Sequence, residues 1–391
     1  VKSLLEQHVV EVKRLLSPAA PFGVGLRLAA AAASELGQPE ELERFHELLG
    51  SRGLYCFTVN GFPYGAFHAA QVKERVYLPD WLDPERVRYT RALARILARL
   101  LPSGIAGSIS TVPGCFRPRS EQEPDVARRI ATSLVEVAAT LVELERDTGK
   151  LIALALEPEP HCLLETTDEA LAFFKTWLFS PGAAAELAKL AGLSTTQAER
   201  ALQRHLGVCL DTCHASVEFE SPLDAYRRLQ LAGIAVPKVQ ISAGLRLAEA
   251  TPERLQALQS FENDVYLHQT VVRSGDKLER FLDLKDAFRS GARAASEWRV
   301  HFHVPIFLRE LGVFESTQAD LLPLLAALGA ERPCPHLEVE TYTWDVLPQR
   351  FRDLPVTEAI ARELRFTLAA LGHPDSNEGA LVAPSRPEAA P

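Results

Sequence analysis

The sequence lacks several features that mark common classes of protein. It has no methionine. It also has no apolar run of about 18 residues, which argues against a membrane-spanning helix, and no basic start followed by an apolar segment, so secretion is not indicated. Neither G-x-G-x-x-G opening a helix after a strand nor G-x-x-x-x-G-K-[ST] occurs, so the usual phosphate-binding loops are not indicated.

Basic charge is also in short supply. The chain carries 42 Lys and Arg against 51 Asp and Glu, a net charge of -9, with no block of basic residues. A duplex nucleic-acid partner is therefore not expected, because phosphate neutralisation needs a basic surface. The six cysteines show no paired spacing, which favours reduced thiols and a cytoplasmic location.

What the chain does contain is an alternation of short apolar runs with longer segments of helical period. Its 391 residues, 47% of them hydrophobic, suffice for a large α/β domain. The alternation predicts a parallel sheet with helices packed outside it. Strands are expected at Phe22–Leu28, Leu54–Asn60, Gly107–Val112, Leu151–Glu157, Gly207–Asp211, Lys238–Ser242, Val300–Ile306 and Leu337–Tyr342.

The positions of polar residues favour a closed barrel over an open sheet. Glu157, Asp211, Gln240, His303 and Glu340 each come late in an apolar run. In a parallel (β/α) barrel, alternate side chains face the interior and functional groups gather at the carboxyl ends of the strands. We therefore predict a TIM-type barrel over residues 1–371, with one shared polar site at that end.

Two segments fall outside the strand–helix pattern. Residues from about 245 to 297 are too many for one strand–helix loop, so we interpret them as an inserted lobe before the His-Phe-His strand. Residues 372–391 are rich in Pro, Ala, Glu and Ser and have no apolar period, which predicts a disordered tail.

Glu157 and Glu159, in Ala-Leu-Glu-Pro-Glu-Pro-His, are the first chemical candidates. The proline after each glutamate favours extended backbone, so both carboxylates can leave a strand end on one side. We expect Glu157 to act as a metal ligand or acid–base group and Glu159 to contact a substrate. A solvated acidic turn, or a carboxylate that caps the next helix, is the alternative.

Asp211 and His214, in Leu-Asp-Thr-Cys-His, can lie over one point where a strand turns into a helix. The alternative is an Asp N-cap with an incidental His.

His301 and His303 flank Phe302 on an expected strand, so their imidazoles point the same way and can reach one metal. Satisfied buried histidines are the alternative for this pair.

Gln240 and Glu340 add oxygen atoms at two further strand ends, although buried polar pairing is an even alternative for Gln240. The predicted metal ligands are Glu157, Asp211, His214, Gln240, His303 and Glu340. Such a set suits Mn²⁺, Zn²⁺, Co²⁺ or Mg²⁺, and its histidines favour the first three. Substrate contacts are expected from Glu159, His68, Lys73, Trp344 and His301.

The strand-end set, in the order Glu157, Asp211-x-x-His214, Gln240, His303 and Glu340, resembles the metal site of xylose-isomerase-like and endonuclease-IV-like barrels. Gln240 stands where these families usually present a His. Longer phrases look like the metabolite traffic protein EboE family, xylose-isomerase-like barrels linked to trafficking of secondary-metabolite precursors. These phrases are Val-Asn-Gly-Phe-Pro-Tyr-Gly (59–65), Ser-Ile-Ser-Thr-Val-Pro-Gly (108–114), Ala-Leu-Glu-Pro-Glu-Pro (155–160), Arg-Val-His-Phe-His-Val-Pro-Ile-Phe (299–307) and Leu-Glu-Val-Glu-Thr-Tyr-Thr-Trp (337–344).

The resemblance also implies that the barrel lacks one strand. In endonuclease-like barrels the segment with the paired histidines belongs to an excursion after the seventh strand, so Val300–Ile306 would lie outside the barrel. The chain opens on a helical pattern, Lys2–Leu16, and its first residue is Val. We therefore expect the first strand before residue 1, with Phe22–Leu28 and Leu337–Tyr342 as open edges flanking a gap.

Three functional hypotheses remain. The first is a metal-dependent isomerase or epimerase of a small polyol or keto-sugar-like metabolite in a precursor-trafficking context, with Glu157, Glu340 and His214 as catalytic residues. The second is a non-catalytic protein that binds and escorts such a metabolite. The third is an endonuclease-IV-like phosphodiesterase, which the negative net charge disfavours. Fold analogy alone does not choose among them.

Overall fold

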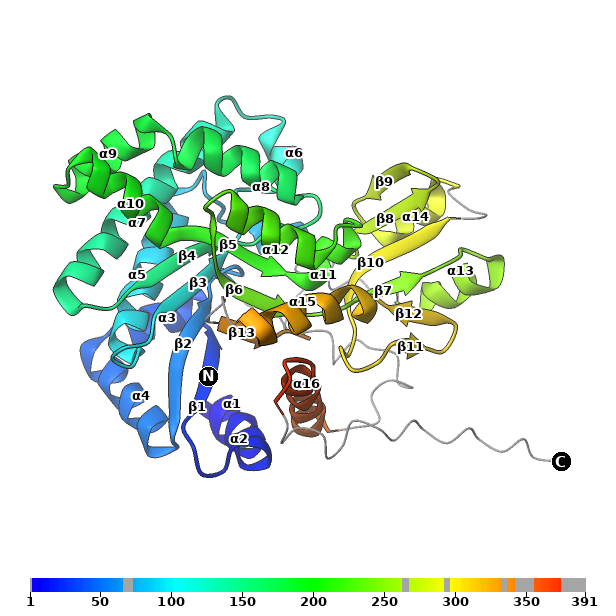
Figure 1. The fold of residues 1–391 in the computed structure, drawn as a ribbon, viewed down its shortest axis with the longest axis horizontal. Helices are drawn as coiled ribbons and strands as arrows, with labels where there is room; N and C mark the ends of the chain where they lie inside the picture. Colours follow the sequence, from blue (N-terminus) through cyan, green and yellow to red (C-terminus); the bar gives the residue numbers. More distant parts are fainter. Residues whose placement is uncertain are drawn as a thin grey trace.

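Seven parallel strands form an incompletely closed barrel in the computed structural model (Figure 1). The structure describes residues 2–65, 73–261, 267–291, 296–331, 336–341 and 355–373. The strand order is β1 (Phe22–Arg27), β2 (Leu54–Asn60), β3 (Gly107–Thr111), β4 (Ile152–Leu156), β5 (Leu206–Asp211), β6 (Ala235–Ile241) and β13 (His336–Val339). The predicted TIM-type parallel barrel is confirmed.

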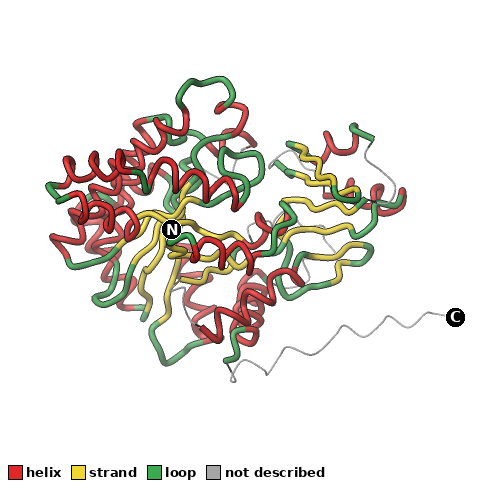
Figure 2. The backbone as a smooth tube through the Cα atoms, turned by 45° about the horizontal axis from the view of Figure 1, so that its top comes forward, coloured by secondary structure: helices red, strands yellow, loops and turns green. Residues whose placement is uncertain are grey.

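Helices cover the outside of this barrel (Figure 2). In chain order they are α1 (Lys2–Leu4), α2 (Val10–Leu16), α3 (Ala30–Leu36), α4 (Pro39–Ser51), α5 (Pro84–Leu100), α6 (Arg117–Ser120), α7 (Val126–Thr148), α8 (Thr167–Phe173), α9 (Pro181–Ala191), α10 (Thr195–His205), α11 (Thr212–Val217), α12 (Pro222–Leu231), α15 (Gln318–Glu331) and α16 (Val356–Ala370). Helix α5 shows why such segments form where they do. Asp83 caps its first turn by accepting from Glu85 N, Pro84 opens it, and Leu93 and Leu97 are buried.

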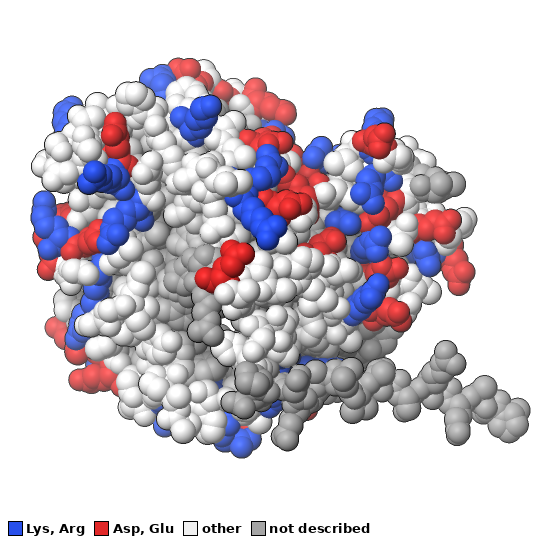
Figure 3. All heavy atoms as spheres, in the orientation of Figure 1, with Lys and Arg blue, Asp and Glu red and all other residues white. Residues whose placement is uncertain are grey.

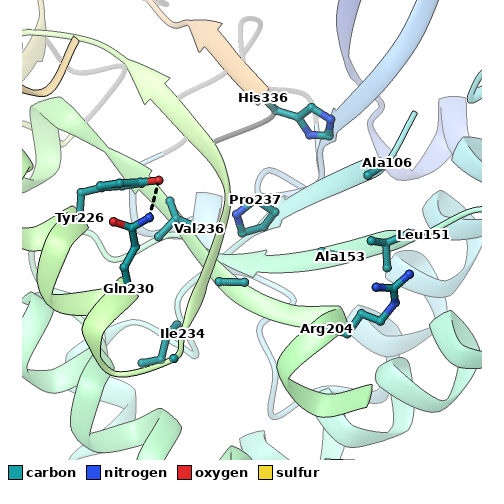
Figure 4. Close-up of a pocket in the computed structure, with 13 residues that line it drawn as sticks. Ala106, Leu151, Ala153, Arg204, Tyr226, Gln230, Ile234, Val236, Pro237 and His336 are labelled. Carbon is teal, nitrogen blue, oxygen red and sulfur yellow. Dashed lines mark hydrogen bonds between the residues drawn. The ribbon is translucent and has the colours of Figure 1, made fainter. Parts of the chain in front are cut away.

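The barrel is open between β1 and β13. Within the described ranges these two strands end the sheet and do not pair with each other, as expected for the edges of a gap. A hollow of about 780 Å³ lies there, and its lining includes Phe22, Gly23, Leu337, Val339, Leu364 and Leu368. A second hollow, of about 430 Å³, lies at the amino ends of β3, β4 and β6 (Figure 4). This second hollow is therefore at the opposite end of the barrel from the predicted site.

The inserted lobe is an antiparallel sheet of six strands. Its order is β11 (Glu310–Leu311), β12 (Phe314–Ser316), β7 (Gly244–Leu247), β10 (Glu297–His303), β8 (Thr270–Ser274) and β9 (Lys277–Phe281), and it carries helices α13 (Pro252–Leu258) and α14 (Leu284–Arg289). The strand with His301 and His303 is therefore an inner strand of the lobe and not a barrel strand. The sheet also extends to Ser316, beyond the segment expected from the sequence.

The lobe lies beside the barrel, on the side where β5 and β6 end (Figure 1). On the face shown in Figure 3, acidic and basic side chains are interspersed. No helix in the described ranges is long and apolar enough to cross a membrane. From residue 374 onward, the tail expected to be disordered lies outside the described residues.

Candidate metal centre

Three carboxylates from separate strands meet at the carboxyl end of the barrel. Glu157 follows β4, Asp211 ends β5 and Glu340 follows β13; one oxygen of each lies within 4.8 Å of the others. Gln240 on β6 joins them, because its Nε2 donates to Glu157 Oε1 at 3.0 Å. The strands are parallel and end at the same rim, so residues far apart in the sequence converge here.

This acidic cluster has the donor atoms that a hard cation needs. Glu157 Oε2, Asp211 Oδ2 and Gln240 Oε1 are buried and have no hydrogen-bond partner within the part of the chain that the structure describes. Leaving such oxygens unsatisfied is costly, since burial removes their hydration. Carboxylate and amide oxygens are also the ligands that Mg²⁺ and Mn²⁺ favour. The residues present therefore fit a divalent ion.

The pKa values of the carboxyl groups in the acidic cluster also favour a bound cation. Burial raises the pKa of Glu157. Burial, together with the charges of Glu157 and Asp211, raises the pKa of Glu340 well above its ordinary value. Asp211 differs: burial opposes its charge, but His214, His303 and a hydrogen bond from Ser242 lower its pKa. Carboxylates crowded in this way repel one another, and a cation at their common point would offset that repulsion.

Asp211 is placed both to cap a helix and to contribute an oxygen to the acidic cluster, the two roles that its motif allowed. Its Oδ1 accepts from the backbone N of Cys213 at 2.7 Å and of His214 at 3.0 Å, which makes it the N-cap of α11. The Ser242 hydroxyl donates to the same oxygen at 2.7 Å. Because Oδ1 is committed to these three donors, Asp211 is held rigidly and Oδ2 is left for the cluster.

Next to the acidic cluster lies an imidazole cluster, made of His214, His301 and His303. One donor atom each of Asp211, His214 and His303 lie within 4.8 Å of one another. Burial lowers the pKa of His303 to about 4 and lowers that of His301 well below its ordinary value. Although burial acts against it, the charges of Asp211, Glu159 and Glu157 raise the pKa of His214. The predicted ligands therefore form two groups that share Asp211.

Glu159 lies behind the imidazoles and not among the three carboxylates. It groups with His214 and His301, and its Oε1 accepts from the Tyr77 hydroxyl at 2.9 Å and from Gln269 Nε2 at 3.2 Å. Burial raises its pKa to about 7. Tyr77 and Gln269 could not be singled out from the sequence, because neither lies in a motif or at a barrel strand end.

The remaining predicted substrate contacts are Lys73, His68 and Trp344. Lys73 Nζ lies 3.5 Å from Asp283 Oδ2, at the start of α14 in the lobe. His68 and Trp344 lie outside the described residues. Lys238 was missed, although it precedes Gln240 by two residues on β6 and so shares its face. The Lys238 side chain is fully buried and pairs with Glu338.

No family model matches the sequence, and no curated protein matches it. Among solved structures, the chain is similar to a xylose isomerase domain protein from Alicyclobacillus acidocaldarius, with 13% identity, 93% of each chain covered and a TM-score of 0.41. It is also similar to D-psicose 3-epimerase with D-tagatose from Clostridium cellulolyticum, at 14% identity, 95% and 93% coverage and a TM-score of 0.44. A third similar structure is that of the IolI protein with a zinc atom, at 12% identity, with 93% of this chain and 92% of that chain covered and a TM-score of 0.44. The strand order, and not these likenesses, defines the fold.

Proposed function

We propose that this protein is a metal-dependent isomerase or epimerase that acts on a small polyol or keto-sugar-like metabolite. The observation that supports the proposal is the set of buried, unsatisfied oxygens Glu157 Oε2, Asp211 Oδ2 and Gln240 Oε1, beside Glu340, at the carboxyl ends of the strands. Active sites of this fold lie at that end of the barrel. The same oxygens would hold the ion.

A bound divalent ion would polarise neighbouring carbonyl and hydroxyl oxygens of a sugar-like ligand. The chain itself must then move a proton, because isomerisation and epimerisation take a proton from carbon and return one. Glu340 is suited to this work, since it is partly exposed and its pKa is raised by burial and by neighbouring carboxylates. Positioned groups of this kind typically contribute about 10²–10⁴-fold to a rate.

Glu159 is a second group able to exchange a proton near neutral pH, because burial raises its pKa to about 7. The Tyr77 hydroxyl and the Gln269 amide both donate to it and hold it in place. Two carboxyl groups in different surroundings can take opposite roles, one accepting a proton while the other donates. His214, which belongs to the imidazole cluster and lies near both Asp211 and Glu159, would orient the ligand or share in this transfer.

The precursor-trafficking context of the proposal rests on the sequence phrases that resemble those of metabolite traffic proteins. An escort protein would use the same ion to hold a metabolite without changing it. The two functions differ in one measurable step, which is the breaking of a carbon–hydrogen bond.

Hydrogen exchange with solvent tests the proposal. The protein, loaded with Mn²⁺, Co²⁺, Zn²⁺ or Mg²⁺ in turn, is incubated in D₂O with a panel of ketoses and polyols, and deuterium in the recovered ligand is measured by mass spectrometry. We expect incorporation with the wild type, and loss of it in Glu340→Gln when metal analysis shows the ion retained. Glu143→Gln, on the exposed face of α7, is the matched control. A ligand that binds tightly but gains no deuterium would support the escort function instead.

A further inference from the structure

Helix α11 lies against one face of the lobe sheet. Arg299, His301 and His303 are alternate residues of β10 and therefore share that face. His301 Nε2 lies 3.1 Å from Nε2 of His214, in the middle of the helix. Arg299 Nη1 donates to Ser216 O, near the end of the helix, at 2.6 Å. The barrel and lobe parts of the candidate site therefore meet along this one helix.

The end of α11 has a strained backbone. Phe219 N donates to Ser216 O at 3.0 Å and Glu220 N donates to Ala215 O at 2.9 Å, the pair of hydrogen bonds that closes a helix in a Schellman motif. Phe219 has a φ of 61°, in the left-handed region. Glycine usually occupies this position, because a side chain there strains the backbone. A phenylalanine is therefore held here against its own conformational preference.

The Phe219 ring is in contact with two arginines of the lobe. The guanidinium carbons of Arg299 and Arg273 lie 4.2 Å and 4.5 Å from its centroid. An aromatic face attracts a cation at this distance, most strongly where water is excluded. Arg299 is only 8% exposed, so its contact is largely desolvated. The two contacts give a reason for a side chain at a position that glycine would fill with less strain.

The carboxylate of Glu297 fixes both arginines. Its Oε1 accepts from Arg299 Nε at 2.9 Å, and its Oε2 accepts from Arg273 Nη2 at 2.6 Å. Although burial opposes the charge of Glu297, hydrogen bonds from Arg246 and Arg299 lower its pKa to about 2. Arg299 also donates to Asp320 Oδ2 on α15 at 2.8 Å. The two guanidinium groups are therefore held in place by the lobe and by α15.

We propose that Phe219 is a positioning residue for His214, because the contact of its ring with the two lobe arginines fixes α11 against the lobe. His214 lies within that helix, and Asp211 caps its first turn. A change in the tilt of α11 would move both groups relative to His301, which belongs to the lobe. The inference rests on the proposed function and adds to it a residue that acts through another.

Hydrogen exchange of the α11 backbone tests the contact independently of activity. The full chain is exchanged in D₂O, and pepsin fragments that span residues 211–220 are analysed by mass spectrometry. Phe219→Leu keeps an apolar side chain but loses the aromatic face, so we expect exchange in this segment to become about 10-fold faster. Phe219→Tyr keeps the face and should match the wild type. Phe179→Leu, whose ring packs edge-on against Phe174, is the matched control.

A double-mutant cycle isolates the contact between the ring and the guanidinium group. Arg273→Met removes the more exposed of the two cations and should itself speed exchange in residues 211–220. If Phe219 acts through Arg273, the double variant should exchange more slowly than the product of the two single effects predicts. Arg289→Met, at an exposed arginine of α14, is the matched control and should leave this segment unchanged.

The deuterium-incorporation assay of the proposed function tests the consequence for the site. Phe219→Leu should lower the rate of incorporation by about 10–100-fold, because a small misplacement of a group at the reacting centre is costly. KM should change little, since the contacts of the ligand with the ion remain. Phe219→Tyr should restore the rate. If the wild type incorporates no deuterium, the proposed function fails, and the exchange measurements still decide whether the ring holds the helix.

Three results would overturn the inference. Unchanged exchange in residues 211–220 of Phe219→Leu would show that the ring does not hold the helix. Equal acceleration in α7 would show a loss of global stability instead of a local effect. Faster exchange in residues 211–220 with unchanged deuterium incorporation would show that the order of α11 does not position His214 for the reaction.

Discussion

Lys238 and Glu338 form an ion pair inside the barrel, with Nζ 2.5 Å from Oε2. The Lys238 side chain is fully buried, while that of Glu338 is 21% exposed through the gap beside β1. Lys238 also donates to Ser110 Oγ at 3.3 Å. Burial raises the pKa of Glu157, and Lys238 is one of the positive charges that oppose this rise. The barrel interior therefore carries a cation of its own close to the acidic cluster.

The two partners of this ion pair should differ in their effect on stability. Glu338→Gln leaves a fully buried ammonium without its carboxylate and should lower the free energy of unfolding by about 3–5 kcal/mol. Lys238→Met should cost less, because the Glu338 carboxylate can reach solvent through the gap. Urea unfolding of both variants at one pH measures the difference. Equal losses, or a larger loss for Lys238→Met, would contradict this account of the pair.

Gly25 on β1 leaves the space that the Glu338 carboxylate occupies. A Cβ at position 25 would lie 1.6 Å from Glu338 Oε1, so Gly25→Ala must displace that side chain. We expect a loss of about 1–3 kcal/mol in unfolding free energy, the usual cost of overpacking. The loss should shrink in a Glu338→Ala background, which a double-mutant cycle measures. Gly50→Ala, with nothing within 4 Å of the added Cβ, is the control and should not destabilise.

The barrel was predictable because its strands are short apolar runs separated by helical segments. The carboxyl ends of parallel strands all lie at the same rim of the barrel. Glu157 and Asp211 could be assigned to one site from that argument alone. An inserted lobe was expected from the length of its segment, but the pairing of its strands could not be predicted, because antiparallel pairs join segments as distant as Gly244–Leu247 and Glu297–His303 and no local pattern specifies such pairing. Gln269 was missed for the same reason: its role depends on a contact across the barrel–lobe junction.

The split of the predicted ligands into two clusters also lies beyond sequence reasoning. Strand periodicity says which side chains share a face, but not which atom of a side chain is already committed. Asp211 was assigned as a ligand against the alternative of a helix cap, and the structure shows one oxygen in the cap and the other in the cluster. Lys238 was overlooked because a lysine inside a barrel is uncommon and becomes tolerable only when its partner, Glu338, is in place.

Glu363 should make stability depend on pH. This α16 side chain is buried, and its Oε1 accepts from Ile306 N at 3.1 Å and from the Thr341 hydroxyl at 2.7 Å. Burial raises its pKa from 4.5 to about 7. The folded state therefore holds a proton that the unfolded state releases between about pH 4.5 and 7, so this contribution to stability falls as pH rises through that window.

Glu363→Gln removes this titration while keeping an acceptor oxygen for both donors. The difference in unfolding free energy between Glu363→Gln and the wild type should therefore grow in favour of the variant from pH 5 to pH 8, by up to roughly 3 kcal/mol. Urea unfolding at the two pH values measures it, and taking the difference between the two proteins cancels groups that titrate in both. A difference that is the same at pH 5 and pH 8 would show that Glu363 is charged in the folded state.

Binding of a hard ion to the acidic cluster should release protons. The pKa values of Glu157 and Glu340 are both raised, by burial first and then by neighbouring carboxylates, so the metal-free cluster retains protons at pH values where free glutamates have lost them. Ligation requires the charged carboxylates, so Mn²⁺ must displace those protons, and its affinity should rise with pH until both groups ionise.

Calorimetric titration with Mn²⁺ in two buffers of different ionisation enthalpy counts the protons released. Glu340→Gln should release fewer than the wild type, while Glu143→Gln should match it. Mn²⁺ affinity that stays constant from pH 5.5 to 8, with no proton release, would mean that the ion does not bind these carboxylates.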